Sequence, residues 1–311
     1  MTAVAAPPRV TGDGRALRPD RSPRRRSFGA IGVYATLLAL AVVYVYPFLI
    51  QVATSFKSDA EAVASPLSLV PATWTSAAYE SLFLASDFPL WFRNSVVITL
   101  CVTLGRVFFN SLAGYALARL DFRGRGVIFA GLVAVMAVPN VVLLIPKFLV
   151  LNELGIYNSF AGLIVPLLAD AAGIFIMKNF FESIPRSVEE AARIDGAGPF
   201  RTYWSVVLPM ARPALITLVI LSFQGSWNEL SHFIVAAQDP DLSPLTKGVA
   251  QLAAGSLGQG RQYPLKLGAA ALMTIPVAVL FFVFQRRIMN VTTRAAKGGG
   301  GPCGVNFEPA L

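Results

Sequence analysis

A long uncharged apolar run constrains this chain more than any other feature. From Ser27 to Phe56 the sequence contains no charged side chain. A helix that crosses the hydrocarbon core of a bilayer needs about 20 predominantly apolar residues, and this run exceeds that length. Comparable apolar runs recur along the chain, separated by short polar segments. The sequence therefore predicts an all-α polytopic membrane protein.

Composition and charge agree with this class. Hydrophobic residues make up 55% of the chain and charged residues 14%, whereas soluble domains carry about 25% charged residues. The net charge of +9 could indicate nucleic-acid binding, but most Lys and Arg residues gather in four segments on one side of a six-span chain: 1–26, 118–126, 178–212 and 286–297. Because basic loops stay in the cytoplasm, we expect both termini to be cytoplasmic and no nucleic-acid partner.

The hydropathy pattern predicts six transmembrane helices, at 27–56, 92–117, 127–150, 161–181, 212–236 and 265–285. The chain then divides into a disordered basic cytoplasmic tail (1–26), a first transmembrane helix with an outer loop (27–91), a core of five transmembrane helices (92–289) and a cytoplasmic C-terminal tail (290–311). Three spans contain prolines, which predict broken or bent helices lining a cavity, or else simple packing kinks: Pro139, Pro146, Pro166 and Pro276.

A polar loop at 183–211 interrupts the core between the fourth and fifth spans. Residues 186–195 combine helix formers with spaced apolar side chains, which predicts a short amphipathic helix. Gly196 and Gly198 follow, and we expect both to end this helix with positive φ angles. A second short helix is expected over 200–207, ended by Pro209.

The same loop carries a recognisable pattern. Six residues fit E-A-A-x3-G-x9-I-x-L-P, with Val206 in the Ile position: Glu190, Ala191, Ala192, Gly196, Leu208 and Pro209. The pattern resembles the coupling loop of permease subunits of binding-protein-dependent ABC sugar importers, and most of all the smaller permease of maltose importers. Similar matches occur at 94–95, 115–119 and 122–124. The resemblance covers about residues 28–298 and implies the type I ABC importer permease fold.

The resemblance also implies which residues contact an ATPase. Residues 290–298 partly match the family ending G-x-T-x-G-A-V-K-G, in which Lys297 and Gly298 would reach the ATPase, but Asn290 and Arg294 replace glycines and leave this contact open. The coupling residues implied in the loop are Glu189, Glu190, Ala191, Ala192, Asp195, Gly196, Leu208 and Pro209.

The implied partners are a second homologous permease, two ATPase subunits, an extracytoplasmic solute-binding protein, a carbohydrate substrate (a mono- or oligosaccharide or a related polyol) and the lipid bilayer of a prokaryotic plasma (inner) membrane. The chain lacks G-x-x-x-x-G-K-[ST], so we expect no catalytic residues and no cofactor or metal here, with ATP and Mg bound by the ATPase. The alternatives are a permease for a non-sugar solute, an independent channel or ion-coupled carrier, and a membrane enzyme, for which no nucleophile or metal motif is present.

The fifth predicted span contains a polar stripe. Gln224, Asn228 and Ser231 share a helical face at i, i+4 and i+7, and Trp227-Asn228 matches a pair in sugar permeases. We interpret this stripe as lining a translocation path; interhelical hydrogen bonding is the alternative. The path residues are Gln224, Trp227, Asn228, Glu229 and Ser231.

Two charged residues fall near the middle of predicted spans, Arg106 and Asp170. A lone charge there costs at least about 2.5 kcal/mol. We therefore expect the two to pair or to border one aqueous cavity. The alternative is that either charge faces the second permease.

Overall fold

The computed structural model describes residues 28–255 and 262–298, and every regular element in these ranges is a helix. The chain divides into two units, Met1–Leu49 and Ile50–Leu311. The described part of the first unit belongs to α1 (Phe28–Ser55), which continues through Pro47. The predicted tail at 1–26 lies outside the described residues.

Four described helical segments are long and apolar enough to cross a membrane: Gly32–Ser55, Phe88–Arg119, Phe160–Ser183 and Tyr263–Gln285. Two bent helix pairs raise the number to six if each pair is one span. The last segment belongs to α15 (Tyr263–Gly298), which continues through Pro276. The prediction of a break at Pro276 was therefore wrong. Residues 290–298 continue this helix.

The third predicted span is sharply broken. It consists of α5 (Arg125–Met136) followed by η1 (Asn140–Leu143) and α6 (Leu144–Glu153), and the two halves are bent by 104°. Pro139 precedes η1 with extended backbone angles. Because proline has no N–H and disfavours a helical residue before it, the helix ends here as predicted.

The fourth span is also interrupted. It contains α7 (Phe160–Ile164), η2 (Val165–Leu167) and α8 (Ala171–Ser183). Asp170 begins α8 as its N-cap, and its carboxylate accepts a hydrogen bond from the Gly173 N–H at 2.7 Å. The carboxylate thus replaces a backbone partner that the interrupted helix lacks.

The fifth span is shorter than predicted. Helix α12 (Arg212–Trp227) ends well before residue 236, and a separate helix, α13 (Ser231–Ala236), follows. Ser231 therefore does not continue the α12 face that holds Gln224 and Asn228. The predicted i, i+4, i+7 stripe was wrong at its last position, because α12 ends before Ser231.

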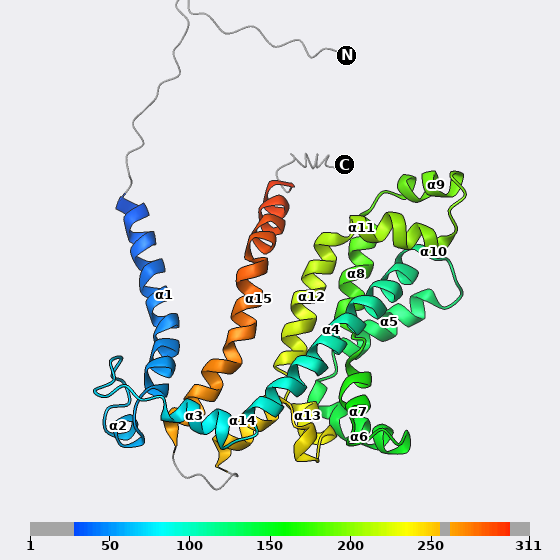
Figure 1. Ribbon diagram of the computed structural model, residues 1–311. Helices are drawn as coiled ribbons and strands as arrows, with labels where there is room; N and C mark the ends of the chain where they lie inside the picture. The colour runs from blue at the N-terminus through cyan, green and yellow to red at the C-terminus, as the bar shows by residue number, and fades with distance from the viewer. Residues whose placement is uncertain (1–27, 256–261, 299–311) are drawn as a thin grey trace, which may run out of the picture. The chain divides into compact units, whose positions relative to one another are not determined.

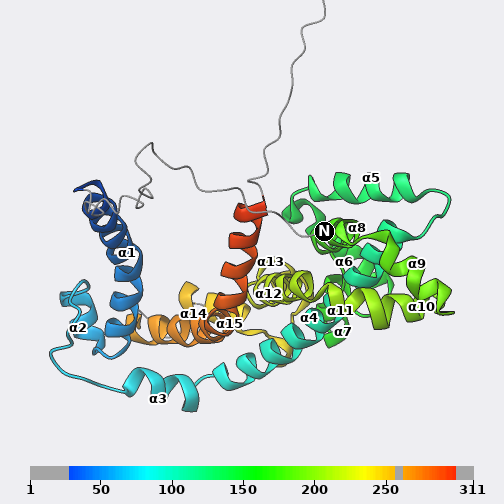
Figure 2. The same cartoon turned by 90° about the horizontal axis from the view of Figure 1, so that it is seen from above.

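Three helices form the centre of the second unit. Helix α4 (Phe88–Arg119) packs against both α8 and α12, and α5 packs on α8 at the edge of this group (Figures 1 and 2). The short helices α9 and α10 lie beyond one end of these helices, whereas α6, α7 and α13 lie at the other end (Figure 1). The bundle thus holds the polar loop at one end.

A second core lies toward the end that holds α13. It is built by α3 (Ala77–Leu84), α14 (Leu245–Ala254), the end of α12 and the first turns of α4 and α15. Helix α2 (Asp59–Ala64) and η4 (Pro240–Leu242) complete this end. The predicted outer loops therefore contain helices of their own. The buried residues of this core include Leu82, Phe88, Trp91, Trp227, Leu252 and Leu265.

We predict that Gly114→Ala destabilises the protein. A Cβ at Gly114 would lie 2.7 Å from the Met177 Cβ and 2.9 Å from the Lys178 backbone nitrogen, so α4 and α8 would have to separate. The free energy of unfolding should fall by about 1–3 kcal/mol, measured as a lower melting temperature in detergent. Gly131→Ala is the matched control, because nothing lies within 4 Å of its Cβ position. An equal effect of both would contradict the packing argument.

Candidate coupling site

The polar loop forms a short chain of helices. It contains α9 (Arg186–Ile194), α10 (Pro199–Thr202), the π-helix η3 (Tyr203–Val207) and α11 (Leu208–Met210). The segment Pro199–Met210 is bent by 81° from α12. The expected helix at 186–195 is therefore present, within one residue.

Gly196 ends α9 as predicted. Its φ is +79°, its N–H donates to the Arg193 carbonyl, and the Ala197 N–H donates to the Ala192 carbonyl. These two bonds form a Schellman motif, which satisfies the last carbonyls of the helix. Gly198 has a φ of −70°, so the expected positive angle there was wrong.

Pro209 does not end the second helix. It lies within α11, which follows η3 directly, and the helical segment continues to Met210 before the chain bends into α12. Leu208 packs partly against the core below it, while Pro209 is exposed.

Helix α9 has a buried and an exposed face. Glu189 and Ala192 are buried, whereas Glu190, Ala191 and Asp195 are exposed. Ile194, which the sequence placed among the apolar residues of an amphipathic helix, is 87% exposed. The implied coupling residues are thus divided between two faces of the loop.

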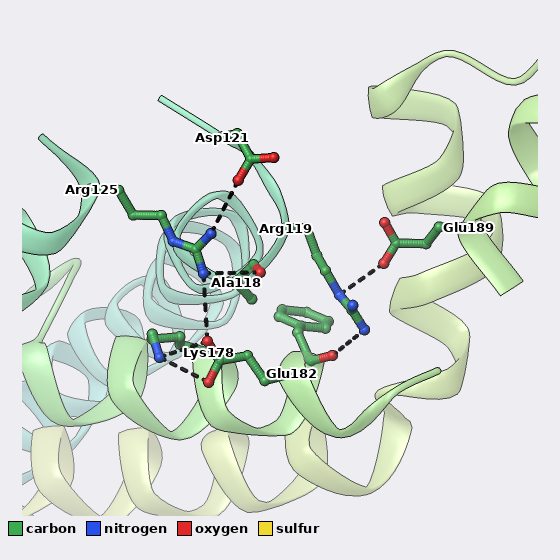
Figure 3. A network of polar contacts seen from close by, with 8 residues as sticks. Ala118, Arg119, Asp121, Arg125, Lys178, Glu182 and Glu189 are labelled. Atoms are coloured by element: carbon green, nitrogen blue, oxygen red, sulfur yellow. Dashed lines mark hydrogen bonds and ion pairs between the residues drawn. The ribbon is translucent and has the colours of Figure 1, made fainter. Parts of the chain in front are cut away.

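A buried ion pair holds the first turn of α9. Arg119 Nε lies 2.9 Å from Glu189 Oε1, and the side chains are only 4% and 6% exposed (Figure 3). The guanidinium also donates through Nη2 to the Phe181 carbonyl at 2.5 Å and to the Ile184 carbonyl. One side chain therefore joins the last residue of α4, the end of α8 and the start of α9.

A second charge network lies nearby on the surface. Arg125 approaches Asp121 at 3.5 Å and Glu182 at 3.6 Å, and Lys178 binds Glu182 at 2.8 Å (Figure 3). The Asp121 side chain is 90% exposed. An exposed ion pair such as Arg125–Asp121 contributes at most about 1 kcal/mol.

Large apolar side chains on the loop face outward. Phe200 is 68% exposed and Trp204 is 52% exposed, and their rings stack with planes 10° apart. Sequence reasoning did not single out either residue. The available signal was an aromatic pair at i, i+4 in the most polar loop of the chain.

Trp227 does not fit the predicted translocation path. It is buried, its Nε1 donates to the Met273 carbonyl at 3.1 Å, and its ring stacks on Phe223. The ring fills the second core at the end of α12, so it cannot stack on a sugar. The sequence interpretation of Trp227 was wrong because this packing comes from α15.

The other path residues lie between the last turn of α12 and the start of α13. Gln224, Asn228 and Ser231 are exposed, and the Asn228 amide donates to the Gln224 carbonyl at 3.0 Å. Glu229 accepts the His232 N–H at 2.9 Å, which caps α13. Gln224 and Asn228 remain exposed amides on one helix.

Arg106 and Asp170 meet, as the sequence predicted. Arg106 Nε lies 3.5 Å from Asp170 Oδ2 and donates to the Leu167 carbonyl at 2.7 Å. Asn110, which sequence reasoning missed, donates to Asp170 Oδ2 at 3.0 Å. The three polar side chains gather at the break between η2 and α8, where backbone groups need partners.

Comparison with known proteins agrees with this geometry. A family model described as "Binding-protein-dependent transport system inner membrane component" matches residues 110–293. The chain therefore belongs to this family of ABC importer permeases.

Relatives and a solved structure extend the match. The diacetylchitobiose uptake system permease protein NgcG of Streptomyces coelicolor is 34% identical over 85% of this chain and 87% of its own length. The trehalose transport system permease protein SugB of Mycobacterium tuberculosis is 32% identical over 74% and 85%. A crystal structure of a bacterial ABC transporter involved in import of the acidic polysaccharide alginate contains a chain 27% identical, with a TM-score of 0.72 over 86% of this chain and 99% of that one. The predicted type I permease fold is confirmed.

We predict that Gly196→Ser destabilises α9 and that Gly198→Ser does not. Neither site has an atom within 4 Å of a new Cβ, so only the backbone angle distinguishes them. A left-handed serine costs about 1–2 kcal/mol, whereas serine suits the N-cap position of Gly198. Hydrogen exchange of the α9 amides should quicken only in Gly196→Ser. Equal exchange in both variants would show that the Schellman motif does not hold α9.

We predict that Asp170→Ala is more destabilising than Asp170→Asn. Asparagine keeps an oxygen that can cap α8, whereas alanine removes both the cap and the partner of Arg106. The free energies of unfolding of the two variants should differ by about 1–2 kcal/mol, measured by thermal unfolding in detergent. Identical melting of the two variants would show that the cap contributes nothing.

Proposed function

We propose that this chain is the permease subunit of an ATP-driven importer of carbohydrates, with the coupling loop at 183–211 receiving the motion of an ATPase. The observation that carries the proposal is an exposed, partly apolar loop surface that bears the E-A-A pattern at one end of the membrane-spanning helices. We name this the coupling surface and define it by four residues: Glu190, Ile194, Phe200 and Trp204.

The chemistry of the coupling surface suits protein docking. Exposed apolar side chains that cluster within a polar rim are typical of protein interfaces. Arg193 and Arg201, the sequence neighbours of Ile194 and Phe200, are also exposed. Glu189 lies on the opposite, buried face, so we assign the external contact to Glu190 and an internal role to Glu189. Asp195 is also exposed and adds to the polar rim, and Ala191 is exposed on the same helix.

The assembly follows from this role. The chain pairs with a second homologous permease, two ATPase subunits that bind ATP and Mg, and an extracytoplasmic solute-binding protein. Both termini and the coupling loop lie in the cytoplasm of a prokaryotic cell, as the distribution of basic residues supports. Lys297 and Gly298, at the end of α15, would add a second contact with the ATPase.

Alternating access would arise from movement of the helical group. ATP binding closes the ATPase dimer, the coupling surface moves with it, and the packed helices rock as a body. A solute site near the bilayer midplane is expected where helices are broken. Gln224 and Asn228 are exposed amides that suit hydroxyl groups, and we assign them to the path.

The carbohydrate class rests on the relatives. Their names refer to diacetylchitobiose and trehalose uptake, and the solved transporter imports alginate. The rival proposal within transport is a non-sugar solute. A vesicle assay with the ATPase, the second permease and a binding protein separates them, because labelled oligosaccharide should enter only with ATP. Solute movement by this chain alone down an ion gradient would contradict the importer proposal.

We predict that Ile194→Asp and Phe200→Asp weaken ATPase binding. Each places a charge where an apolar side chain would be desolvated, so affinity should fall by about tenfold or more. The measurement is the amount of ATPase that copurifies with the permease in detergent.

Leu84→Asp is the matched control for these variants. Leu84 is 86% exposed on α3, away from the loop. ATPase recovery should be unchanged in this control. Equal recovery with Ile194→Asp and Phe200→Asp would contradict the assignment of the coupling surface.

A further inference from the structure

The Arg119 side chain, which comes from the last residue of α4, lies against the C-terminal end of α8. Its guanidinium donates to the Phe181 and Ile184 carbonyls. Carbonyls in the last turn of a helix lack intrahelical partners and carry partial negative charge. A cation from α4 therefore both bonds these carbonyls and complements the helix dipole, which fixes the end of α8 against the end of α4.

The Nε side of the same guanidinium lies at the N-terminal end of α9, where it pairs with Glu189. Glu189 lies in the first turn of α9, where partial positive charge favours a carboxylate. Burial of both side chains limits screening by salt, and a buried charge that loses its partner is strongly destabilised. The arrangement in Figure 3 therefore resists separation of α9 from α4 and α8.

The chain connections of α9 are unequal. Ile184 and Pro185 alone separate α8 from α9, and Pro185 has a restricted φ of −59°. Toward α10 the link holds Gly196 and Gly198, which touch nothing at their Cβ positions. Beyond this link, η3 has an anchor of its own, since the Tyr203 and Ser111 hydroxyls lie 2.8 Å apart.

We propose that Arg119 is a positioning residue for coupling: its ion pair with Glu189 makes α9 move as one body with the cytoplasmic ends of α4 and α8. This inference rests on the proposed function. A displacement of the coupling surface then enters the membrane through α4 and α8. Without the ion pair, α9 would keep its external contacts but tilt on its glycine link instead of moving the bundle.

The test measures solute moved per ATP hydrolysed by the assembled transporter in vesicles. Glu189→Gln should retain the ATPase and its ATP hydrolysis, while solute per ATP falls by about tenfold or more. Arg119→Lys keeps a charge for Glu189 and should lose less than Arg119→Gln. The double variant Arg119→Gln with Glu189→Gln should lose no more than the single variants, because they act through one interaction.

Asp121→Asn is the matched control, since it removes a surface ion pair from the same end of α4. Its ratio should equal that of the unmodified protein. An unchanged ratio in assembled Glu189→Gln overturns the inference, as does a parallel fall of transport and ATP hydrolysis. If Glu189→Gln does not assemble, the inference is judged instead by the solute moved per ATP hydrolysed in the Arg119→Lys complex. Failure of the unmodified complex to import with ATP would instead refute the proposed function.

Discussion

The absence of water in the bilayer interior is the constraint on which this structure depends. Backbone groups there must bond within helices or find polar side chains. Where the fourth span breaks, the chain supplies those partners itself: Asp170 caps α8, the Arg106 guanidinium donates to the Leu167 carbonyl, and Asn110 Oδ1 accepts the Asp170 N–H. The broken helix is thus compatible with the membrane because three side chains replace the missing helical bonds.

Close packing between α4 and α8 extends to the coupling loop. Gly114 lets α4 and α8 approach closely, and the core between them continues without interruption into η3 through Tyr115, Phe181 and Tyr203. The loop is therefore an extension of the helical bundle. A coupling element must transmit displacement, and a loop that shares a core with two membrane helices is suited to do so.

The polar contacts of the loop separate an internal from an external role. Glu189 and Glu190 are adjacent in sequence, but one helical step places the first against Arg119 and the second in solvent. The buried face of α9 carries Glu189 and Ala192, whereas Ile194 lies among charged residues on the exposed face. Docking to an ATPase would bury that exposed face.

Local sequence determined much of this protein. Long apolar runs specified the membrane helices, Pro139 specified the break in the third span, and Gly196 specified the end of α9, because each acts on its own segment of backbone. The costs of lone buried charges were enough to predict the meeting of Arg106 and Asp170. Only tertiary structure decided which side of α9 is buried, that Trp227 packs against α15, and that Arg119 joins three helix ends. These depend on contacts between distant segments, and no local pattern records which side chains the packed bundle brings together.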